Sequence, residues 1–349
     1  MSARTICEVI DYGGPTGGSF IPAMESLTRA LTERGDRCVF LAHEVHGATW
    51  PADLMKAGAT VHLVQSDREV VDGLRMLCPE IVHSHFNRFD LAAVHGAPHS
   101  RIIWHVHSHR NDRSFTSRIR AFAKYRLLGR RMNAIVAVSR FVAQECVAWC
   151  APRERVRVLE NGIDTHRFHP PAPAERAEAR AKFHFADSDR VVLFFERVPY
   201  KGGATLREAM RSTPGFRVLV VGGTQEDRDR FGDAPRVISI QRLTETRLAY
   251  WAADALAFAS DDHEAFPFVL LEGLACGVPV AAANIPVVQQ VCAGVDSVVL
   301  FPVGDGEALA HALGEAMTRS GDQAGRERIV KAFGLDRWTA DMLRLYDSS

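Results

Sequence analysis

Short apolar runs alternate with amphipathic stretches along the first half of the chain. The runs have the length and composition of buried strands, and the stretches between them repeat apolar residues at helical spacing. We expect strands at residues 5–10, 38–42, 60–64, 81–85, 101–107 and 134–138. Strands that alternate with helices predict a mostly parallel sheet covered by helices on both faces, so the expected fold class is α/β.

The second half repeats this pattern after a break. Residues 170–181 are rich in Pro, Ala, Glu and Arg, which is typical of a linker followed by a helix start. Beyond it we expect a helix at 244–253 and strands at 191–195, 217–221, 237–240, 254–259 and 278–283. A chain of 349 residues is long enough for two domains with a core each, and we place their boundary near residue 165.

Composition narrows the class of protein. Apolar residues make up 47% and charged residues 24% of the chain, as in soluble globular proteins. The formal net charge is zero, so no overall field attracts nucleic acid. Because there is no apolar run of about 18 residues and no signal-peptide pattern, we expect no transmembrane segment. Seven cysteines without a C-x-x-C pair fit a reducing cytoplasm, and abundant Ala, Arg, Gly and Val suggest a bacterial source.

One stretch, residues 260–280, has the organisation of a ligand site. A polar turn follows the apolar run that ends at residue 259, and Pro267 then stands where a first helical residue would. Apolar residues continue at helical spacing until Gly277 and Pro279 end the helix. The N-terminus of this helix therefore lies at the carboxyl end of a strand, where open α/β sheets bind ligands.

Two carboxylates flank this helix start. A helix N-terminus offers unpaired N–H groups and a partial positive charge, which favour a phosphate. Glu264 precedes the helix, and Glu272 lies five residues beyond Pro267, roughly 7.5 Å along the axis and leaning back toward the same place. Carboxylates would repel a phosphate, but they can accept hydrogen bonds from sugar hydroxyls on either side of a diphosphate. The alternative is an ordinary amphipathic helix with two solvated glutamates.

Three motifs resemble those of retaining glycosyltransferases of family 4, which have the GT-B fold. The first is E-x7-E from Glu264 to Glu272, followed by A-C-G-x-P. The second is N-G-I-D at residues 161–164, with Phe168 behind it. The third is R-x3-K-G at residues 197–202. The resemblance extends over nearly the whole chain.

The resemblance implies an architecture. Two Rossmann-like β/α/β domains would face each other across a cleft. Residues 1–165 would form the acceptor-binding domain and residues 166–332 the domain that binds the nucleotide-sugar donor. The last helix, within residues 333–349, would cross back and pack on the first domain.

It also implies a reaction. A glycosyl group would pass from a nucleotide-diphosphate sugar, with UDP-sugars favoured, to an acceptor hydroxyl with retention of configuration. The setting would be bacterial glycan or natural-product biosynthesis in the cytoplasm, with a small-molecule, saccharide or lipid-linked acceptor. We expect no cofactor and no metal requirement, because Arg197 and Lys201 can supply positive charge to the departing diphosphate.

The resemblance assigns roles to residues. The implied catalytic residues are His107, Glu264, Arg197 and Lys201. The implied donor-binding residues are Gly17, Gly18, Arg197, Lys201, Glu264, Ala265, Phe266, Pro267, Phe268 and Glu272. A solvated basic turn is the alternative for Arg197 and Lys201. Two departures from the family pattern affect the site: Glu196 replaces a glycine, and residues 283–290 lack an acidic residue that the family carries there.

The loop after the first strand is rich in glycine. Pro15 and Thr16 break the G-x-G-x-x-G spacing, which disfavours a Rossmann dehydrogenase. Gly17 and Gly18 occupy the place of the family's glycine loop, where a backbone without Cβ atoms can approach donor and acceptor. A tight turn that needs positive φ is the alternative.

Histidines are concentrated between residues 83 and 109. His105, His107 and His109 alternate, so an extended strand would place them on one face. Zinc is conceivable there, but no cysteine lies nearby and no acidic residue accompanies them before Asp112, which disfavours a metal site. The resemblance implies instead that His107 ends a strand and faces the donor sugar, and a histidine of the core is the alternative.

Residues 113–132 form a basic segment without an acidic residue. The favoured interpretation is a surface helix whose apolar stripe packs on the core, because one basic helix gives only modest attraction to a membrane. A peripheral contact with a membrane or an anionic acceptor stays open.

Two other functions remain open at this stage. A sugar-nucleotide epimerase of the same fold would use the same donor cleft without an acceptor. A two-domain sugar-phosphate binding protein would bind the donor without turnover.

Overall fold

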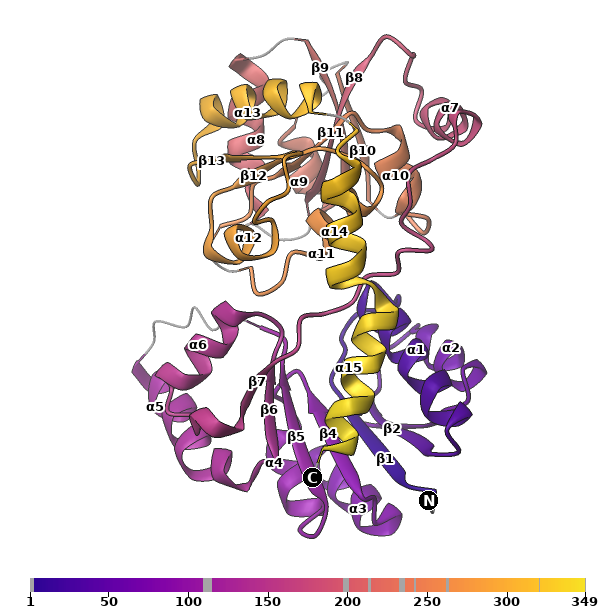
Figure 1. The fold of residues 1–349 in the computed structure, drawn as a ribbon, viewed down its shortest axis with the longest axis vertical. Helices are drawn as coiled ribbons and strands as arrows, with labels where there is room; N and C mark the ends of the chain where they lie inside the picture. The colour runs from indigo at the N-terminus through magenta and orange to yellow at the C-terminus, as the bar shows by residue number, and fades with distance from the viewer. Residues whose placement is uncertain are drawn as a thin grey trace. The chain divides into compact units, whose positions relative to one another are not determined.

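The structure is a computed structural model that describes residues 3–108, 115–196, 201–212, 215–231, 236–241, 243–261, 264–319 and 321–348. The chain forms two compact units, the first made of Met1–Gly162 with Leu335–Ser349 and the second of Ile163–Gly334 (Figure 1). The divisions thus fall at 162/163 and 334/335, where the sequence predicted 165/166 and 332/333.

The first unit is built on a parallel sheet of seven strands in the order β3-β2-β1-β4-β5-β6-β7. Its strands are β1 (Thr5–Ile10), β2 (Arg37–His43), β3 (Thr60–Val64), β4 (Ile81–His85), β5 (Arg101–Val106), β6 (Ala134–Ala137) and β7 (Val156–Val158). The strand order reverses between β1 and β4, so the carboxyl ends of these two strands mark the switch point at which such sheets bind ligands.

Helices cover both faces of this sheet. Its helices are α1 (Phe20–Glu33), α2 (Trp50–Lys56), α3 (Asp67–Leu77), α4 (Asp90–Gly96), α5 (Phe115–Ala123), α6 (Arg140–Ala148) and α15 (Leu335–Asp347). A short π-helix, Lys124–Leu128, continues α5. Residues of α1, α2 and α15 share one hydrophobic core with one face of the sheet, and residues of α3 and α4 share a second core with the other face.

The last helix belongs to the first unit although it follows the second in sequence. Trp338, Met342 and Tyr346 of α15 are fully buried against the sheet. Ser26 of α1 and Thr339 of α15 are also joined by a 2.8 Å hydrogen bond between their hydroxyls. The apolar stripe of α15 therefore closes the core that α1 begins.

The second unit has a parallel sheet of six strands in the order β10-β9-β8-β11-β12-β13. Its strands are β8 (Arg190–Glu196), β9 (Phe216–Gly222), β10 (Val237–Ile240), β11 (Ala255–Phe258), β12 (Val280–Ala283) and β13 (Val298–Phe301). Its helices are α7 (Pro173–Lys182), α8 (Gly203–Ser212), α9 (Gln225–Asp229), α10 (Arg247–Ala252), α11 (Phe268–Ala275), α12 (Pro286–Val291), α13 (Gly306–Thr318) and α14 (Gln323–Phe333). The order reverses here between β8 and β11.

The predicted strands are present, with small shifts at their ends. β5 ends at Val106, so His107 follows the strand instead of ending it. Pro267 caps α11 with φ −88° and ψ 68°, so it precedes the helix by one residue and is not the first helical residue. The short strands β7 and β13 were not predicted.

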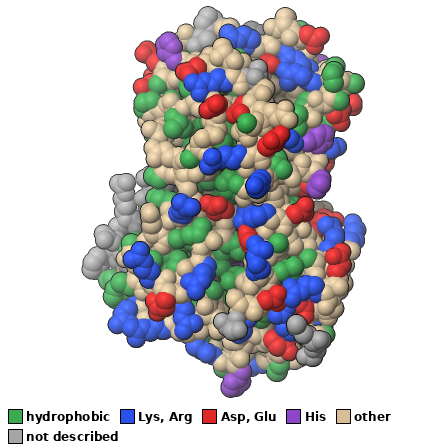
Figure 2. Space-filling model, in the orientation of Figure 1, with side chains coloured by type: hydrophobic (Ala, Val, Ile, Leu, Met, Phe, Trp, Pro, Cys, Tyr) green, Lys and Arg blue, Asp and Glu red, His purple; other side chains and the backbone are tan. Residues whose placement is uncertain are grey.

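The surface carries both signs of charge. On the face that Figure 2 shows, Lys and Arg side chains are interspersed with Asp and Glu, as the zero net charge leads one to expect. Among the described residues, no helix is both long enough and apolar enough to cross a bilayer.

Candidate functional site

The main candidate site is a pocket in the second unit, at the carboxyl ends of β8 and β11 and the start of α11. It has a volume of about 330 Å³, at the lower end of the range for small-molecule sites. The lining residues are Phe194, Phe195, Lys201, Ala257, Phe258, Ala259, Ser260, Glu264, Phe266, Phe268 and Val269. Of the predicted donor-binding residues, the lining thus includes Lys201, Glu264, Phe266 and Phe268.

Lys201 and Glu264 form an ion pair at this pocket. Their side chains are only 16% and 11% exposed, and the Lys201 Nζ atom lies 5.7 Å from the centroid of the Phe258 ring. The sequence placed these two residues in separate motifs, and the structure brings them together. Each charge is neutralised by the other, so a ligand that separates them must offer both an anionic group and a hydrogen-bond donor.

Gly202 is required by the geometry next to Lys201. Its φ of +84° lies in the left-handed region, and a Cβ atom there would stand 2.2 Å from the carbonyl oxygen of Ala259. Any larger residue would push the loop after β8 away from the end of β11. The glycine of the R-x3-K-G motif therefore has a direct structural reason, which is the close contact of two backbones beneath the pocket.

Glu272 lies deeper than the sequence predicted. It is buried on the second turn of α11, with 5% of its surface exposed, and it is not among the pocket-lining residues. The hydroxyl of Tyr250 on α10 donates to its Oε2 atom at 2.9 Å. Ala265 is also buried outside the lining, and Pro267 is not part of it.

Arg197 lies outside the described residues. Its neighbour Glu196, at the end of β8, is buried, and the Oε2 atom has no hydrogen-bond partner within the described part of the chain. Burial raises the pKa of the Glu196 carboxyl to about 7, and the nearby Asp227 carboxylate adds to the rise. This carboxyl packs on Gly203, where a Cβ atom would lie 2.1 Å from Oε2.

In the first unit, Gly17 and Gly18 lie between β1 and α1. Gly18 has φ +51°, and a Cβ atom there would lie 2.6 Å from the Tyr12 hydroxyl. The peptide carbonyl of Gly17 accepts a hydrogen bond from the N–H of Ile21 at 3.1 Å, which starts α1. The two glycines therefore make the turn that their alternative interpretation required, and their donor-binding role stays a prediction.

His107 follows β5 and is half-buried. Its Nε2 atom is hydrogen-bonded to Nδ1 of His85 at 2.9 Å, and its ring stacks on Phe86 with centroids 4.5 Å apart. Burial lowers the pKa of His107 well below the usual value, so the ring is neutral. Its predicted contact with a donor sugar stays a prediction.

A local feature next to His107 has no counterpart in the sequence pattern. Phe86 and Asn87, which follow β4, have φ of +64° and +66°. Two consecutive left-handed residues that are not glycine are uncommon and costly, and such strain gathers at binding sites. Asn87 is held there by a hydrogen bond from the Lys124 ammonium group at 3.1 Å.

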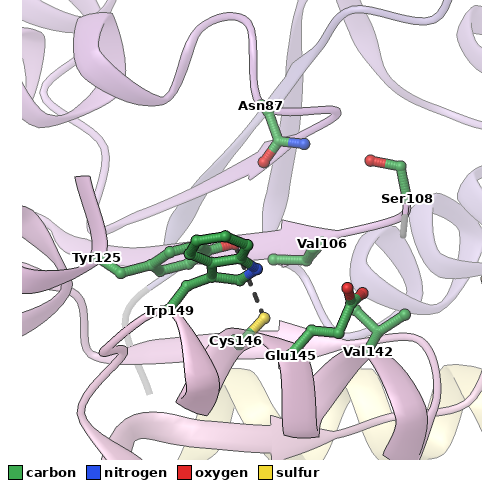
Figure 3. A pocket seen from close by; sticks show the side chains of 8 residues that line it. All are labelled: Asn87, Val106, Ser108, Tyr125, Val142, Glu145, Cys146 and Trp149. Carbon is green, nitrogen blue, oxygen red and sulfur yellow. Dashed lines mark hydrogen bonds between the residues drawn. The ribbon is translucent and has the colours of Figure 1, made fainter. Parts of the chain in front are cut away.

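A much smaller hollow of about 10 Å³, with room for about one water molecule, lies beside these residues. It is lined by Asn87, Val106, Ser108, Tyr125, Val142, Glu145, Cys146 and Trp149. Figure 3 shows Asn87 and Ser108 across from the rings of Tyr125 and Trp149, and Cys146 donating to the Tyr125 hydroxyl at 3.7 Å. Hydroxyl, amide and carboxylate groups thus surround an aromatic floor within the first unit.

Four histidines gather on one face of the first sheet, and two of them, His105 and His107, belong to the group of three that the sequence predicted. Nitrogen atoms of His83, His85 and His105 lie within 4.8 Å of one another, and His107 stacks beside them. His83 and His85 come from β4, which the pairing of His85 with His105 brings next to β5. His109 lies outside the described residues.

The basic segment differs from the favoured interpretation. Three of the five residues of the predicted apolar stripe are exposed, Ile119 at 51%, Phe122 at 49% and Leu127 at 73%, while Ala123 and Leu128 are half-buried. Most of the stripe therefore does not pack on the core. Tyr125 is buried in their place, because the helix changes to a π-helix at Lys124 and shifts the register. Lys124 turns inward and forms an ion pair with the buried Asp90.

Two family models match the chain. Residues 23–167 match the model described as Glycosyltransferase Family 4, and residues 189–319 match the one described as Glycosyl transferases group 1. A D-inositol 3-phosphate glycosyltransferase of Mycobacteroides abscessus is 34% identical over 205 residues, which are 54% of this chain and 45% of the relative. The chain therefore spans about half the length of the curated relatives it matches.

A second relative is named for a GDP-mannose donor. The GDP-mannose-dependent alpha-(1-6)-phosphatidylinositol monomannoside mannosyltransferase of Mycolicibacterium smegmatis is 26% identical over 256 residues, 68% of this chain and 66% of the relative.

Solved structures agree with the fold along the chain. A glycosyltransferase from Rickettsia africae has a TM-score of 0.85 at 17% identity, covering 99% of this chain and 98% of the other. Anabaena Alr3699/HepE, solved with UDP and glucose, has a TM-score of 0.84 at 16% identity, covering 99% and 100%. The two family models, which together match most of the chain, show that the protein belongs to glycosyltransferase family 4, and the two parallel sheets with these structural likenesses show that it has the GT-B fold.

Proposed function

We propose that the protein transfers a sugar from a nucleoside-diphosphate sugar to a hydroxyl group of an acceptor, with retention of configuration. The observation that carries this proposal is the Lys201–Glu264 ion pair, which lies in the pocket at the start of α11. A diphosphate offers the anionic group for Lys201, and a sugar hydroxyl offers the hydrogen-bond donor for Glu264. A nucleotide sugar combines both in one molecule.

The proposed mechanism begins when donor binding separates this ion pair. Lys201 moves to the diphosphate, and Glu264 is left to accept hydrogen bonds from the sugar. Negative charge grows on the diphosphate as the glycosidic bond breaks, so Lys201 contributes most in the transition state. Arg197 is expected to supply a second positive charge, and the start of α11 adds unpaired N–H groups. We expect turnover without a metal, since these groups provide the charge a cation would bring.

In this proposal Glu272 belongs to the donor site although it does not line the pocket. Its carboxylate is fixed by the Tyr250 hydroxyl at the second turn of α11, behind Phe268 and Val269 of the lining. We propose that it accepts a hydrogen bond from a hydroxyl of the nucleotide ribose. We further propose that His107 assists the chemical step.

UDP is the proposed nucleotide, with a bacterial glycan or natural product as the setting. Support comes from a structural neighbour solved with UDP and glucose, while the name of one relative specifies GDP-mannose. The binding test must therefore include both nucleotides.

The acceptor is proposed to bind on the surface of the first unit, where Asn87, Ser108 and Glu145 offer hydrogen-bonding groups beside the small hollow of Figure 3, which is itself too small for an acceptor. A lipid-linked acceptor is favoured by the exposed apolar residues Ile119 and Leu127, which lie on a segment without acidic residues. Apolar and basic groups together suit the surface of an anionic membrane. The proposed location is the cytoplasm, in part at the inner face of the membrane.

Binding to vesicles tests this surface. The protein should bind vesicles with a third phosphatidylglycerol and not pure phosphatidylcholine, and Leu127→Ser should weaken binding several-fold. Leu91→Ser, which changes an exposed leucine on α4 (50% exposed, against 73% for Leu127), is the control. Equal binding to both vesicle types, or equal loss in both variants, would contradict the proposed surface.

Transfer itself is tested with labelled UDP-glucose and a panel of polyol, saccharide and phosphoinositide acceptors, read by mass spectrometry of the products. The proposal expects release of UDP that depends on an acceptor, together with a glycosylated product. A sugar nucleotide altered in the absence of any acceptor would indicate an epimerase. Binding without any turnover over the panel would indicate a sugar-phosphate binding protein.

A further inference from the structure

Six side chains of the first unit form one continuous line of hydrogen bonds. They come from β1, β4 and α15 and from β5 with the residue that follows it, and all but the last are fully buried. In order along the line they are His105, His83, Tyr346, Glu8, His85 and His107. The line therefore runs from the interior of the sheet to the half-buried His107 at its edge.

The half of the line that reaches His107 has only two consistent proton arrangements. Glu8 Oε2 lies 2.9 Å from His85 Nε2, and His85 Nδ1 lies 2.9 Å from His107 Nε2. If Glu8 is ionised, it can only accept, so His85 must donate from Nε2 and keep a lone pair on Nδ1. His107 must then donate from Nε2, and its remaining nitrogen, Nδ1, is a hydrogen-bond acceptor.

Protonation of Glu8 reverses this order. The carboxyl then donates to His85 Nε2, His85 donates from Nδ1, and His107 accepts at Nε2 and carries its proton on Nδ1. One proton taken up at His107 Nδ1 thus ends on Glu8, after one N–H bond has broken and another has formed on each ring. Neither imidazole carries a charge in either state.

We propose that Glu8, acting through His85, determines whether the remaining nitrogen of His107 donates or accepts a hydrogen bond. Glu8 and His85 are positioning residues in this scheme, and His107 is the group that faces a ligand. Only that last role rests on the proposed glycosyltransferase function. The coupling between Glu8 and the His107 tautomer stands on the hydrogen bonds alone.

The rest of the line is compatible with both arrangements, because Oε1 of Glu8 accepts from Tyr346 in either state. Tyr346 donates to Glu8 Oε1 at 2.7 Å, so its oxygen accepts from His83 Nδ1 at 2.6 Å. His83 Nε2 then accepts from His105 Nδ1 at 3.2 Å. The Nε2 atom of His105 then carries no proton, only a lone pair. Consistently, this buried nitrogen has no hydrogen-bond partner among the described residues.

The same proton count explains why these histidines lie so close together. Two lone pairs that face each other would call for a bound cation. Here each nitrogen–nitrogen contact is a hydrogen bond in which one ring donates its proton and the other accepts it, at 3.2 Å for His83 with His105 and 2.9 Å for His85 with His107. Hydrogen bonds therefore suffice to hold the four rings together.

The electrostatic surroundings favour the carboxyl over the rings as the place where the proton resides. Burial raises the pKa of Glu8 to about 8 and lowers that of His85 to about 3. The titratable groups packed around Glu8 are Cys7, Cys38, His83, His85 and Tyr346. Among these, the Tyr346 hydrogen bond opposes the rise, because it stabilises the ionised carboxylate.

Imidazole NMR tests the proposal directly. In protein with 15N-labelled histidine, long-range 1H–15N correlations report the tautomer of each ring. We expect His107 to change from the Nδ1–H form near pH 6.5 to the Nε2–H form near pH 9.5. In Glu8→Gln the change should be lost, because an amide carries no titrating proton.

Tyr346→Phe provides a second variant in which Glu8 is kept. Loss of the phenol hydrogen bond should move the midpoint upward, by about one pH unit. Ser84→Ala is the matched control, since Ser84 lies between His83 and His85 on β4 but bonds to Asp90 instead. It should leave the midpoint unchanged.

Three results would overturn the proposal. The His107 tautomer could stay constant across this pH range in the native protein. The pH-dependent change of the His107 tautomer could persist in Glu8→Gln with the native midpoint, or its midpoint could be unchanged in Tyr346→Phe. Finally, elemental analysis could find a stoichiometric metal ion whose removal alters the histidine signals. None of these results depends on whether the protein transfers a sugar.

Discussion

Replacing Glu196 by glutamine should stabilise the protein at alkaline pH and leave its stability unchanged at acidic pH. Glu196 ends β8 with only 5% of its surface exposed, and its Oε2 atom has no partner in the described chain. Burial, reinforced by Asp227, raises its pKa from 4.5 to about 7, although Arg207 and Arg230 oppose the shift. Glutamine has nearly the shape of the protonated acid and no charge to bury.

The sign follows from proton binding. Between pH 4.5 and about 7 the native state holds the Glu196 proton more often than the unfolded chain does. Stability contributed by this group is therefore fully present below the unfolded pKa and is lost as the pH rises through the folded one. From near pH 5 to near pH 8.5 the loss from Glu196 amounts to about 2.5 kcal/mol.

Urea unfolding of the native protein and of Glu196→Gln at these two pH values measures the effect. The difference in unfolding free energy between them should shift by about 2.5 kcal/mol in favour of the variant at the higher pH. Glu178→Gln, on the exposed face of α7, is the control and should differ from the native protein equally at both. If Glu196→Gln also showed the same difference at both pH values, the buried carboxyl would not titrate as argued.

Further predictions concern the site. Gly202→Ala should destabilise the protein by about 3 kcal/mol or more in urea unfolding, since its Cβ would meet a backbone oxygen, while Gly215→Ala, with open space around it, should have little effect; equal effects would refute the close contact. Glu272→Ala should weaken nucleoside-diphosphate binding in calorimetry with the fold intact, and unchanged affinity would remove Glu272 from the site. Turnover should survive EDTA, whereas loss restored by manganese would establish a metal requirement. His107→Ala should lower kcat more than nucleotide affinity, and full activity would show that His107 has only a structural role.

The fold was predictable where apolar runs were long and fully buried. β8 and β11 are such runs, and both were placed to within about a residue or two. β7 was missed because its three residues are not buried, so no apolar run marks it. The boundary of α11 moved by one residue because a proline suits either the cap or the first position.

The sequence predicted which residues of a single segment belong to the site, but not which residues of different segments meet there. The E-x7-E and R-x3-K-G motifs located Lys201 and Glu264, but neither motif predicts that the two side chains meet. Their contact depends on β8 and β11 being neighbours, which a sequence does not state. The histidine line depends in the same way on the adjacency of β4 and β5 and on α15 returning to β1.

Other features depend on the backbone alone. Asn is enriched in the left-handed region, but nothing in the residue type of Phe86 predicts that it precedes Asn87 in the same conformation. The exposure of Leu127 likewise follows from a π-helical turn that helical periodicity does not describe. Strain and register shifts of this kind are set by the packing of the whole unit.

Calorimetric titration of the protein with UDP and with GDP tests the central claim most directly, because the claim is that the pocket at the start of α11 binds a nucleoside diphosphate through Lys201. We predict that one of the two nucleotides binds with one site per chain. Lys201→Met should weaken this binding at least tenfold, about 1.4 kcal/mol, while Lys331→Met, on the exposed side of α14, should leave it unchanged. Failure of both nucleotides to bind, or equal affinity in the native protein and Lys201→Met, would contradict the account.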